Sequence, residues 1–289
     1  MWLIWILIYL ALLALILFHA IAYSIRWYEE ARKRGDEHSL WELSPRNALS
    51  ILAELICHAL VLLLLAADLI VTLRKYPWRL RKPLTEADAA PPTLAPTPER
   101  PVVLLHGLGM RGLTMWPLAR RLRRGGRKVH LFTYWPPGRP VEAYARQLHD
   151  FLEELRRKEG YDEFDAVGHS MGGLVARQYL ALYEGARRVK HLVTLGTPHG
   201  GSELWRFSPF ASGRQLRPGG EMLRRLDAAG LPPGVQATAI ASDFDELVVP
   251  NANARWEAPG VQNVTVSNAG HAQLIFHGET YRHIRQALT

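Results

Sequence analysis

Cysteine is nearly absent from this sequence, and charge is wholly absent from its first 25 residues. The one cysteine, Cys57, excludes an intrachain disulfide and leaves the redox compartment open. The charge-free stretch exceeds the roughly 20 residues that a helix needs to cross a bilayer. A cleaved signal peptide would begin with basic residues, but no Lys or Arg precedes Arg26. We therefore predict a retained membrane helix at about residues 2–25.

A second apolar stretch, at about residues 48–73, is interrupted by polar side chains that share one face. On a helix, Glu54, His58 and Asp68 fall within one narrow sector. Such a stripe faces another helix or a water-filled cavity rather than lipid. We expect it to pack against the first helix or a second copy of the chain, so that leucine at these positions leaves the activity of the remaining chain unchanged. A proton or ion path is the alternative, but it needs more than two helices per chain.

Signatures of nucleic-acid binding are also missing, although the formal net charge is +8. The basic side chains gather at 74–82, beside Tyr76 and Trp78, and again at 120–128. Neither cluster has zinc-finger spacing or an RNP-like motif. Basic residues beside aromatic ones after an apolar helix are typical of a membrane surface. We expect a membrane and no nucleic acid as partner, and we also consider self-association through the two apolar helices.

A proline-rich segment divides the chain. Residues 83–101 contain six prolines and little apolar content, which is typical of a semi-extended spacer. We therefore predict a membrane hairpin at 1–82, a linker at 83–100 and a single globular domain at 101–289.

Short apolar runs alternate with helical stretches from residue 102 onward. Strands are expected at 102–106, 128–134, 164–169, 190–196, 236–242 and 261–267. Helices are expected at 114–124, 141–158, 171–184, 219–229 and 273–288. This alternation predicts an α/β fold with a mostly parallel sheet and helices on both faces. In such folds the ligand site lies beyond the carboxyl ends of the strands.

The most informative motif is G-x-S-x-G at residues 168–172, directly after an expected strand and before an expected helix. In that context it indicates a nucleophile elbow, in which the two glycines avoid collisions around an exposed Ser170. The helix dipole there favours a developing anion. An ordinary glycine-rich turn is the alternative. The oxyanion donors of this architecture are backbone N–H groups, here those of Met171 and, from the loop after the first strand, Leu108.

Five short segments together resemble one known family. They are HGLG at 106–109, GHSMGG at 168–173, GTPHGGS at 196–202, DELVVP at 245–250 and GHAQLI at 270–275. In this order they are similar to the α/β-hydrolase superfamily, and within it to the bacterial triacylglycerol lipases and esterases. The two apolar helices and the linker lie outside the resemblance.

The resemblance implies a triad in the chain order Ser, acid, His. Ser170 would be the nucleophile, Asp245 the acid and His271 the base. Asp243 is the second choice for the acid and Glu246 the third. The resemblance implies no metal and no organic cofactor.

The other histidines of the domain are expected to have other roles. His106, His169 and His199 would shape loops or pack in the core. His277 and His283, in or beside the last helix, would be solvated.

The expected reaction is hydrolysis of acyl esters, of lipid origin, by a serine lipase or carboxylesterase. A phospholipase or an acyltransferase would use the same triad, and a non-catalytic binding or scaffold protein on this fold is the alternative from another class. Residues 202–233 carry aromatic and apolar side chains next to the expected site. This segment could be a lid over an acyl pocket, or a connection with one packed helix.

Basic residues give conflicting signals on membrane orientation. Five lie between residues 26 and 46, and five more lie at 74–82. We predict a protein with two membrane spans, of the bacterial inner membrane. Because the first helix usually dominates, we expect the catalytic domain on the periplasmic side, although the compact cluster at 74–82 favours the opposite side.

Overall fold

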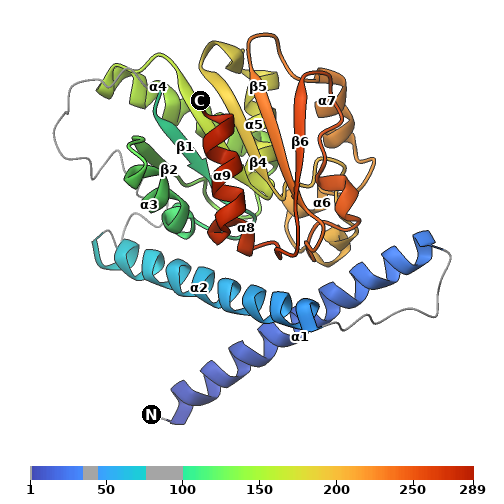
Figure 1. The fold of residues 1–289 in the computed structure, drawn as a ribbon. Coiled ribbons are helices and arrows are strands. Elements are labelled where there is room, and N and C mark those ends of the chain that lie inside the picture. Colours follow the sequence, from blue (N-terminus) through green and yellow to red (C-terminus); the bar gives the residue numbers. More distant parts are fainter. Residues whose placement is uncertain (1, 35–44, 76–99) are drawn as a thin grey trace.

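A computed structural model describes residues 2–34, 45–75 and 100–289 (Figure 1). The expected linker at 83–100 lies, except for its last residue, outside the described residues, and so does most of the basic cluster at 74–82. The proposed domain boundaries therefore stay predictions.

A parallel sheet forms the centre of the domain. The strands are β1 (Val102–Leu105), β2 (Val129–Phe132), β3 (Phe164–His169), β4 (Val189–Leu195), β5 (Gln236–Ser242) and β6 (Val261–Val266). Their order is β2-β1-β3-β4-β5-β6, and every neighbouring pair is parallel. The first three strands are buried throughout, as expected for strands that helices cover on both faces. The prediction of the fold class is confirmed.

Helices cover both faces of this sheet (Figure 1). Side chains of α4 (Val141–Glu159), α5 (Met171–Leu182) and α7 (Glu221–Ala229) form one core with the sheet. Side chains of α3 (Trp116–Arg124), α8 (Gln273–Phe276) and α9 (Gly278–Ala287) form the other. The short helix α6 is Ala211–Arg214, and the 3-10 turns are η2 (Gly112–Met115), η3 (Gly185–Arg187), η4 (Glu203–Phe207) and η5 (Asn251–Ala254).

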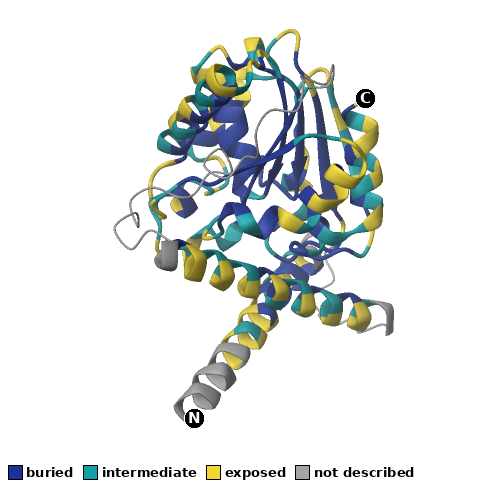
Figure 2. Cartoon of the chain, turned by 90° about the vertical axis from the view of Figure 1, so that its left-hand side faces the viewer, coloured by how far each residue is buried: buried dark blue, intermediate teal, exposed yellow. Residues whose placement is uncertain are grey.

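The two N-terminal helices, α1 (Trp2–Arg34) and α2 (Pro45–Lys75), are longer than the apolar stretches that predicted them. Helix α2 runs across one end of the domain below α8, and α1 crosses α2 near one end (Figure 1). Both helices expose apolar side chains on the side away from the domain (Figure 2). Among the described residues, only Asn47–Thr72 forms a helix long and apolar enough to cross a membrane. The prediction of two membrane spans is therefore not supported.

The polar stripe of α2 faces mainly the part of the chain that contains the sheet, and only in part the first helix, which was its expected partner. Glu54 is fully buried against the loop before α8, and Asp68 pairs with Arg111, just after the loop that follows β1. His58 meets the first helix, as expected, through a contact with His19. Periodicity defines a polar face, but the side chains that satisfy it come from elsewhere in the chain.

Candidate active site

The nucleophile elbow lies where β3 ends and α5 begins. Ser170 has a φ of 55° and a ψ of −128°, in a backbone region that residues with a side chain rarely adopt. A Cβ on Gly172 would lie 2.6 Å from two backbone oxygens at the end of β1. A Cβ on Gly168 would lie 2.5 Å from the nitrogen of Gly173. Only glycine fits on either side, and the side chain of Ser170 stays partly exposed.

Asp245 and His271 form a buried pair beyond the ends of β5 and β6. Asp245 Oδ2 lies 2.7 Å from His271 Nδ1. The other carboxylate oxygen accepts hydrogen bonds from the backbone N–H groups of Leu247 at 2.8 Å and Val248 at 2.9 Å. Because Nδ1 donates to the acid, Nε2 of the neutral ring carries the lone pair. This is the tautomer that a general base for serine needs.

The surroundings shift the pKa values of both groups. Burial disfavours the charged carboxylate, but His271 and the two N–H groups hold the pKa of Asp245 below its usual value. Burial also lowers the pKa of His271, but Asp245, Glu246 and Glu54 together raise it to about 9. The charged imidazolium is thereby stabilised, as required when this ring takes a proton from serine.

Backbone contacts at the end of β4 bring the serine and this pair together. The N–H of Ser170 donates to the carbonyl of Leu195 at 2.8 Å. A Cβ on the next residue, Gly196, would lie 2.9 Å from Asp245 Oδ2 and 3.1 Å from His271 Nδ1. Leu195, which contacts the serine, and Gly196, which contacts the acid–base pair, are therefore neighbours in the chain. The three predicted triad residues lie at the same edge of the sheet.

The two expected oxyanion donors lie beside the elbow. A Cβ on Gly107 would lie 3.1 Å from the Cβ of Ser170, so the loop that carries Leu108 runs against the serine. Leu108 and Met171 both line one pocket with a volume of about 250 Å³. Its other lining side chains are mainly apolar and aromatic, with Tyr134 among them. The two residues that are expected to supply the donors thus line a small apolar pocket.

Neither alternative acid occupies the position of Asp245. Asp243 Oδ1 accepts a hydrogen bond from the N–H of Asn268 at 2.7 Å and so fixes a loop. Glu246 Oε2 accepts one from the backbone N–H of His271 at 3.0 Å. Glu246 therefore orients the backbone of the histidine rather than its ring.

Two further histidines near the site are fully buried. His106 stacks on Tyr134 with ring centroids 3.9 Å apart, and its Nδ1 donates to the carbonyl of Gly107 at 2.9 Å. Burial lowers its pKa to about 3. His169 Nε2 donates to the carbonyl of His271 at 3.0 Å, and burial lowers its pKa to about 3 as well. Both stay neutral and shape the loops around the serine.

The segment at 202–233 does not line the pocket that the structure describes. Met222 and Leu226 of α7 are buried in the domain core, and Phe207 is 67% exposed. Of the two interpretations of this segment, the packed connection agrees with the structure.

Helix α2 supplies contacts to the site that sequence reasoning missed. Glu54 accepts hydrogen bonds from the backbone N–H of Ala272 at 2.6 Å and of Gln273 at 2.9 Å. These two residues directly follow His271. The carboxylate therefore holds the N-terminal turn of α8, where free N–H groups need an acceptor. The polar stripe was the only sign of these contacts in the sequence. It indicated which face of α2 is polar, but not which residues that face contacts.

The other end of α2 closes the pocket. Leu65 and Leu69 line it together with Leu108 and Met171. Asp68 and Thr72 bond to the Arg111 guanidinium, which follows the loop with the expected oxyanion donor. Behind the acid–base pair, the two N-terminal helices and the β5 loop also bring together two histidines and two glutamates that could hold a metal ion.

Comparisons with known proteins agree with this geometry at the level of the fold. A family model for the alpha/beta hydrolase fold matches residues 100–217. The chain is 31% identical over 112 residues to abhydrolase domain-containing protein abhd-5.2 of Caenorhabditis elegans, covering 36% of this chain and 24% of that protein. It is 32% identical over 141 residues to the 1-acylglycerol-3-phosphate O-acyltransferase ABHD5 of Sus scrofa, covering 46% of this chain and 38% of that protein. The match thus spans well under half of either relative.

A solved structure matches a larger part of the chain. Lipase BlEst2 of Bacillus licheniformis, in its mature form, is similar with a TM-score of 0.59 and 21% identity. The similarity covers 71% of this chain and 97% of that one. At this identity the likeness concerns the fold. The family-model match and the likeness to this structure together show that the chain has the α/β-hydrolase fold.

Proposed function

We propose that the protein is a serine hydrolase of acyl esters. Ser170 is the nucleophile, His271 the base and acid, and Asp245 the residue that orients the ring. The N–H groups of Leu108 and Met171 form the oxyanion hole. The observation that carries this proposal is the buried 2.7 Å contact of His271 Nδ1 with Asp245, at the same sheet edge as the strained Ser170.

In the first half of the reaction, Ser170 Oγ attacks the ester carbonyl while His271 Nε2 takes its proton. The tetrahedral oxyanion accepts hydrogen bonds from the two backbone N–H groups. It collapses as the imidazolium returns the proton to the leaving alcohol, which gives an acyl-serine. A water molecule, deprotonated by the same ring, then attacks the acyl carbonyl, and the released Ser170 Oγ regains the proton.

The pocket and the N-terminal helices favour an ester of lipid origin. All but three of the exposed large hydrophobic side chains among the described residues lie on α1 and α2. An apolar helix face next to a polar one is typical of a helix that lies in a membrane interface. The apolar pocket that α2 closes lies directly behind this face. The protein would therefore bind a membrane surface and take an acyl chain from it.

The test uses the full chain, because α2 contributes to the site. Hydrolysis of p-nitrophenyl esters from acetyl to palmitoyl would be measured for the native chain, Ser170→Ala and the control Ser24→Ala. The hydroxyl of Ser24 bonds only within α1, to the carbonyl of Ala20. We expect turnover to vanish in Ser170→Ala alone, together with labelling by a fluorophosphonate. Equal turnover in native chain and Ser170→Ala would refute the mechanism, and absence of both turnover and labelling would favour a binding protein.

An acyltransferase is the second candidate, favoured by the similarity to the acyltransferase ABHD5 of Sus scrofa. The acyl-serine would then pass its acyl group to an alcohol instead of water. Adding 1-acylglycerol-3-phosphate to the assay separates the two activities. A transferase would form the diacyl product at the expense of free fatty acid.

A further inference from the structure

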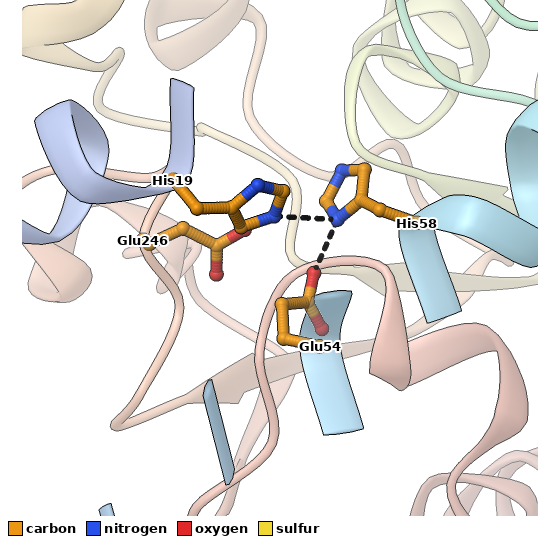
Figure 3. A group of neighbouring side chains, drawn as sticks. All are labelled: His19, Glu54, His58 and Glu246. Atoms are coloured by element: carbon orange, nitrogen blue, oxygen red, sulfur yellow. Dashed lines mark hydrogen bonds and ion pairs between the residues drawn. The ribbon is translucent and has the colours of Figure 1, made fainter. Parts of the chain in front are cut away.

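Four buried side chains from three distant segments of the chain meet in one cluster (Figure 3). They are His19 of α1, Glu54 and His58 of α2, and Glu246 of the loop after β5. One nitrogen or oxygen of each lies within 4.8 Å of all the others. We propose that these four side chains bind a divalent transition-metal ion of the zinc class, a site that the sequence analysis, which expected no metal, did not anticipate.

The separations between the ligand atoms suit a four-coordinate site. His58 Nδ1 lies 2.9 Å from Glu54 Oε1 and 3.0 Å from His19 Nε2. His19 Nε2 lies 3.9 Å from Glu246 Oε1. Zinc bonds of about 2.0–2.2 Å in a tetrahedron place neighbouring ligand atoms roughly 3.3 Å apart. Since all four atoms lie within 4.8 Å of one another, shifts of up to about one ångström in these side chains would complete such a tetrahedron.

When both glutamates are ionised, the hydrogen-bond donors in this cluster are too few for its acceptors. His19 Nδ1 lies 2.9 Å from the carbonyl of Leu15, which can only accept, so Nδ1 carries the proton and Nε2 a lone pair. His58 Nδ1 has at most one proton for two facing acceptors, His19 Nε2 and Glu54 Oε1. Glu246 Oε1 is buried without any hydrogen-bond partner among the described residues. One cation would satisfy all four lone pairs.

His19, Glu54 and Glu246 also make hydrogen bonds to the backbone, and such bonds usually orient the ligands of a metal ion. His19 donates its other ring N–H to a backbone carbonyl. Both oxygens of Glu54 accept N–H groups of the α8 turn, and Glu246 Oε2 accepts the N–H of His271. The ligands are thus already oriented toward one point.

The donor set selects the kind of ion. Calcium and magnesium prefer oxygen ligands only, whereas imidazole nitrogen suits zinc and its neighbours. Four protein ligands leave no open position, which is typical of structural zinc sites. The ion would clamp α1 and α2 to the loop that carries Asp245. This role goes beyond the proposed hydrolysis and does not depend on it.

The test measures metal content and zinc-dependent stability rather than activity. The full chain, purified in detergent, would be analysed by inductively coupled plasma mass spectrometry after dialysis. We expect about one zinc per chain, lost on treatment with a strong chelator. Returning zinc to the stripped protein should raise its melting temperature. In His19→Ala and His58→Ala, zinc affinity should fall at least tenfold. The control is His283→Ala, whose ring lies only near Glu279 within α9, and it should bind zinc like the native chain.

Cobalt adds a readout of geometry. Cobalt in a tetrahedral site gives intense visible bands, which His19→Ala should lose. The proposal is overturned if the native chain binds no zinc and its melting temperature ignores added zinc. It is equally overturned if His19→Ala and His58→Ala retain zinc with native affinity. In either case the cluster is a buried network held by shared protons or water.

Discussion

Glu54 gives the sharpest test of whether α2 is part of the active site. Its carboxylate holds the backbone N–H groups of Ala272 and Gln273, next to His271, with bonds of 2.6 and 2.9 Å. A hydrogen bond to a charged group contributes about 1.5–3 kcal/mol. In Glu54→Gln the amide keeps one acceptor oxygen, so one of the two bonds survives. The histidine loop then loses about 1.5–3 kcal/mol of preference for its ordered arrangement.

Since 1.4 kcal/mol is a factor of ten, this loss shifts the loop equilibrium about 10- to 150-fold. We expect Glu54→Gln to lower kcat for p-nitrophenyl butyrate by about tenfold or more, and Glu54→Leu to lower it further. KM should change little, because Glu54 does not line the pocket. The rate of fluorophosphonate labelling should fall in parallel with kcat.

Two controls isolate the effect. Glu221→Gln, at an exposed position on α7, should behave like the native chain. His19→Ala removes a proposed metal ligand but no hydrogen bond to the histidine loop, and so reports on the disturbed cluster while the Glu54 carboxylate is still present. If folded Glu54→Gln and Glu54→Leu, checked by circular dichroism, kept kcat within twofold, the coupling between α2 and the histidine would be refuted.

Three further substitutions test the site. Asp245→Asn should lower kcat by roughly 10³–10⁴-fold with the fold intact, because His271 would adopt the wrong tautomer; steady-state kinetics beside a thermal melt would show it. Gly172→Ala should lower stability by about 1–3 kcal/mol, seen as a reduced melting temperature, whereas Gly278→Ala, with nothing within 4 Å, should not. Leu65→Trp should fill part of the pocket and reduce turnover of palmitoyl but not acetyl esters; an unchanged chain-length profile would show that acyl chains bind elsewhere.

The sheet and the elbow could be predicted from the sequence because their signals are local. Each strand is a short apolar run, and each has its partner helix nearby in the chain. Around Ser170, a side chain in place of glycine would collide with residues nearby in the chain or with the end of β1. The G-x-S-x-G motif therefore already contains the information that fixes the turn. Asp245 and His271 follow strands, and parallel strands end at the same edge of the sheet.

The contacts of α2 could not be predicted in this way. Glu54 and Ala272 are 218 positions apart, and no spacing rule joins a polar stripe to a loop that far along the chain. The metal-ligand cluster is harder still, since His19 stands alone in an apolar helix. Glu54 and His58 lie four residues apart on one helix face. They were the only two members of the cluster that their spacing in the sequence could have brought together.

Hydropathy also predicted two membrane spans where the described residues hold one candidate helix, and there is a physical reason for caution with such a signal. It measures length and apolar content, and both are nearly the same for a helix that spans a bilayer and for one that lies along its surface. The polar face decides between them. If α2 spanned the membrane, Glu54 would leave the histidine loop or draw that loop into hydrocarbon, where each unpaired backbone group costs several kcal/mol. A helix lying in the interface keeps these bonds and its apolar contact with lipid, and Leu65 and Leu69 still line the pocket beside Met171.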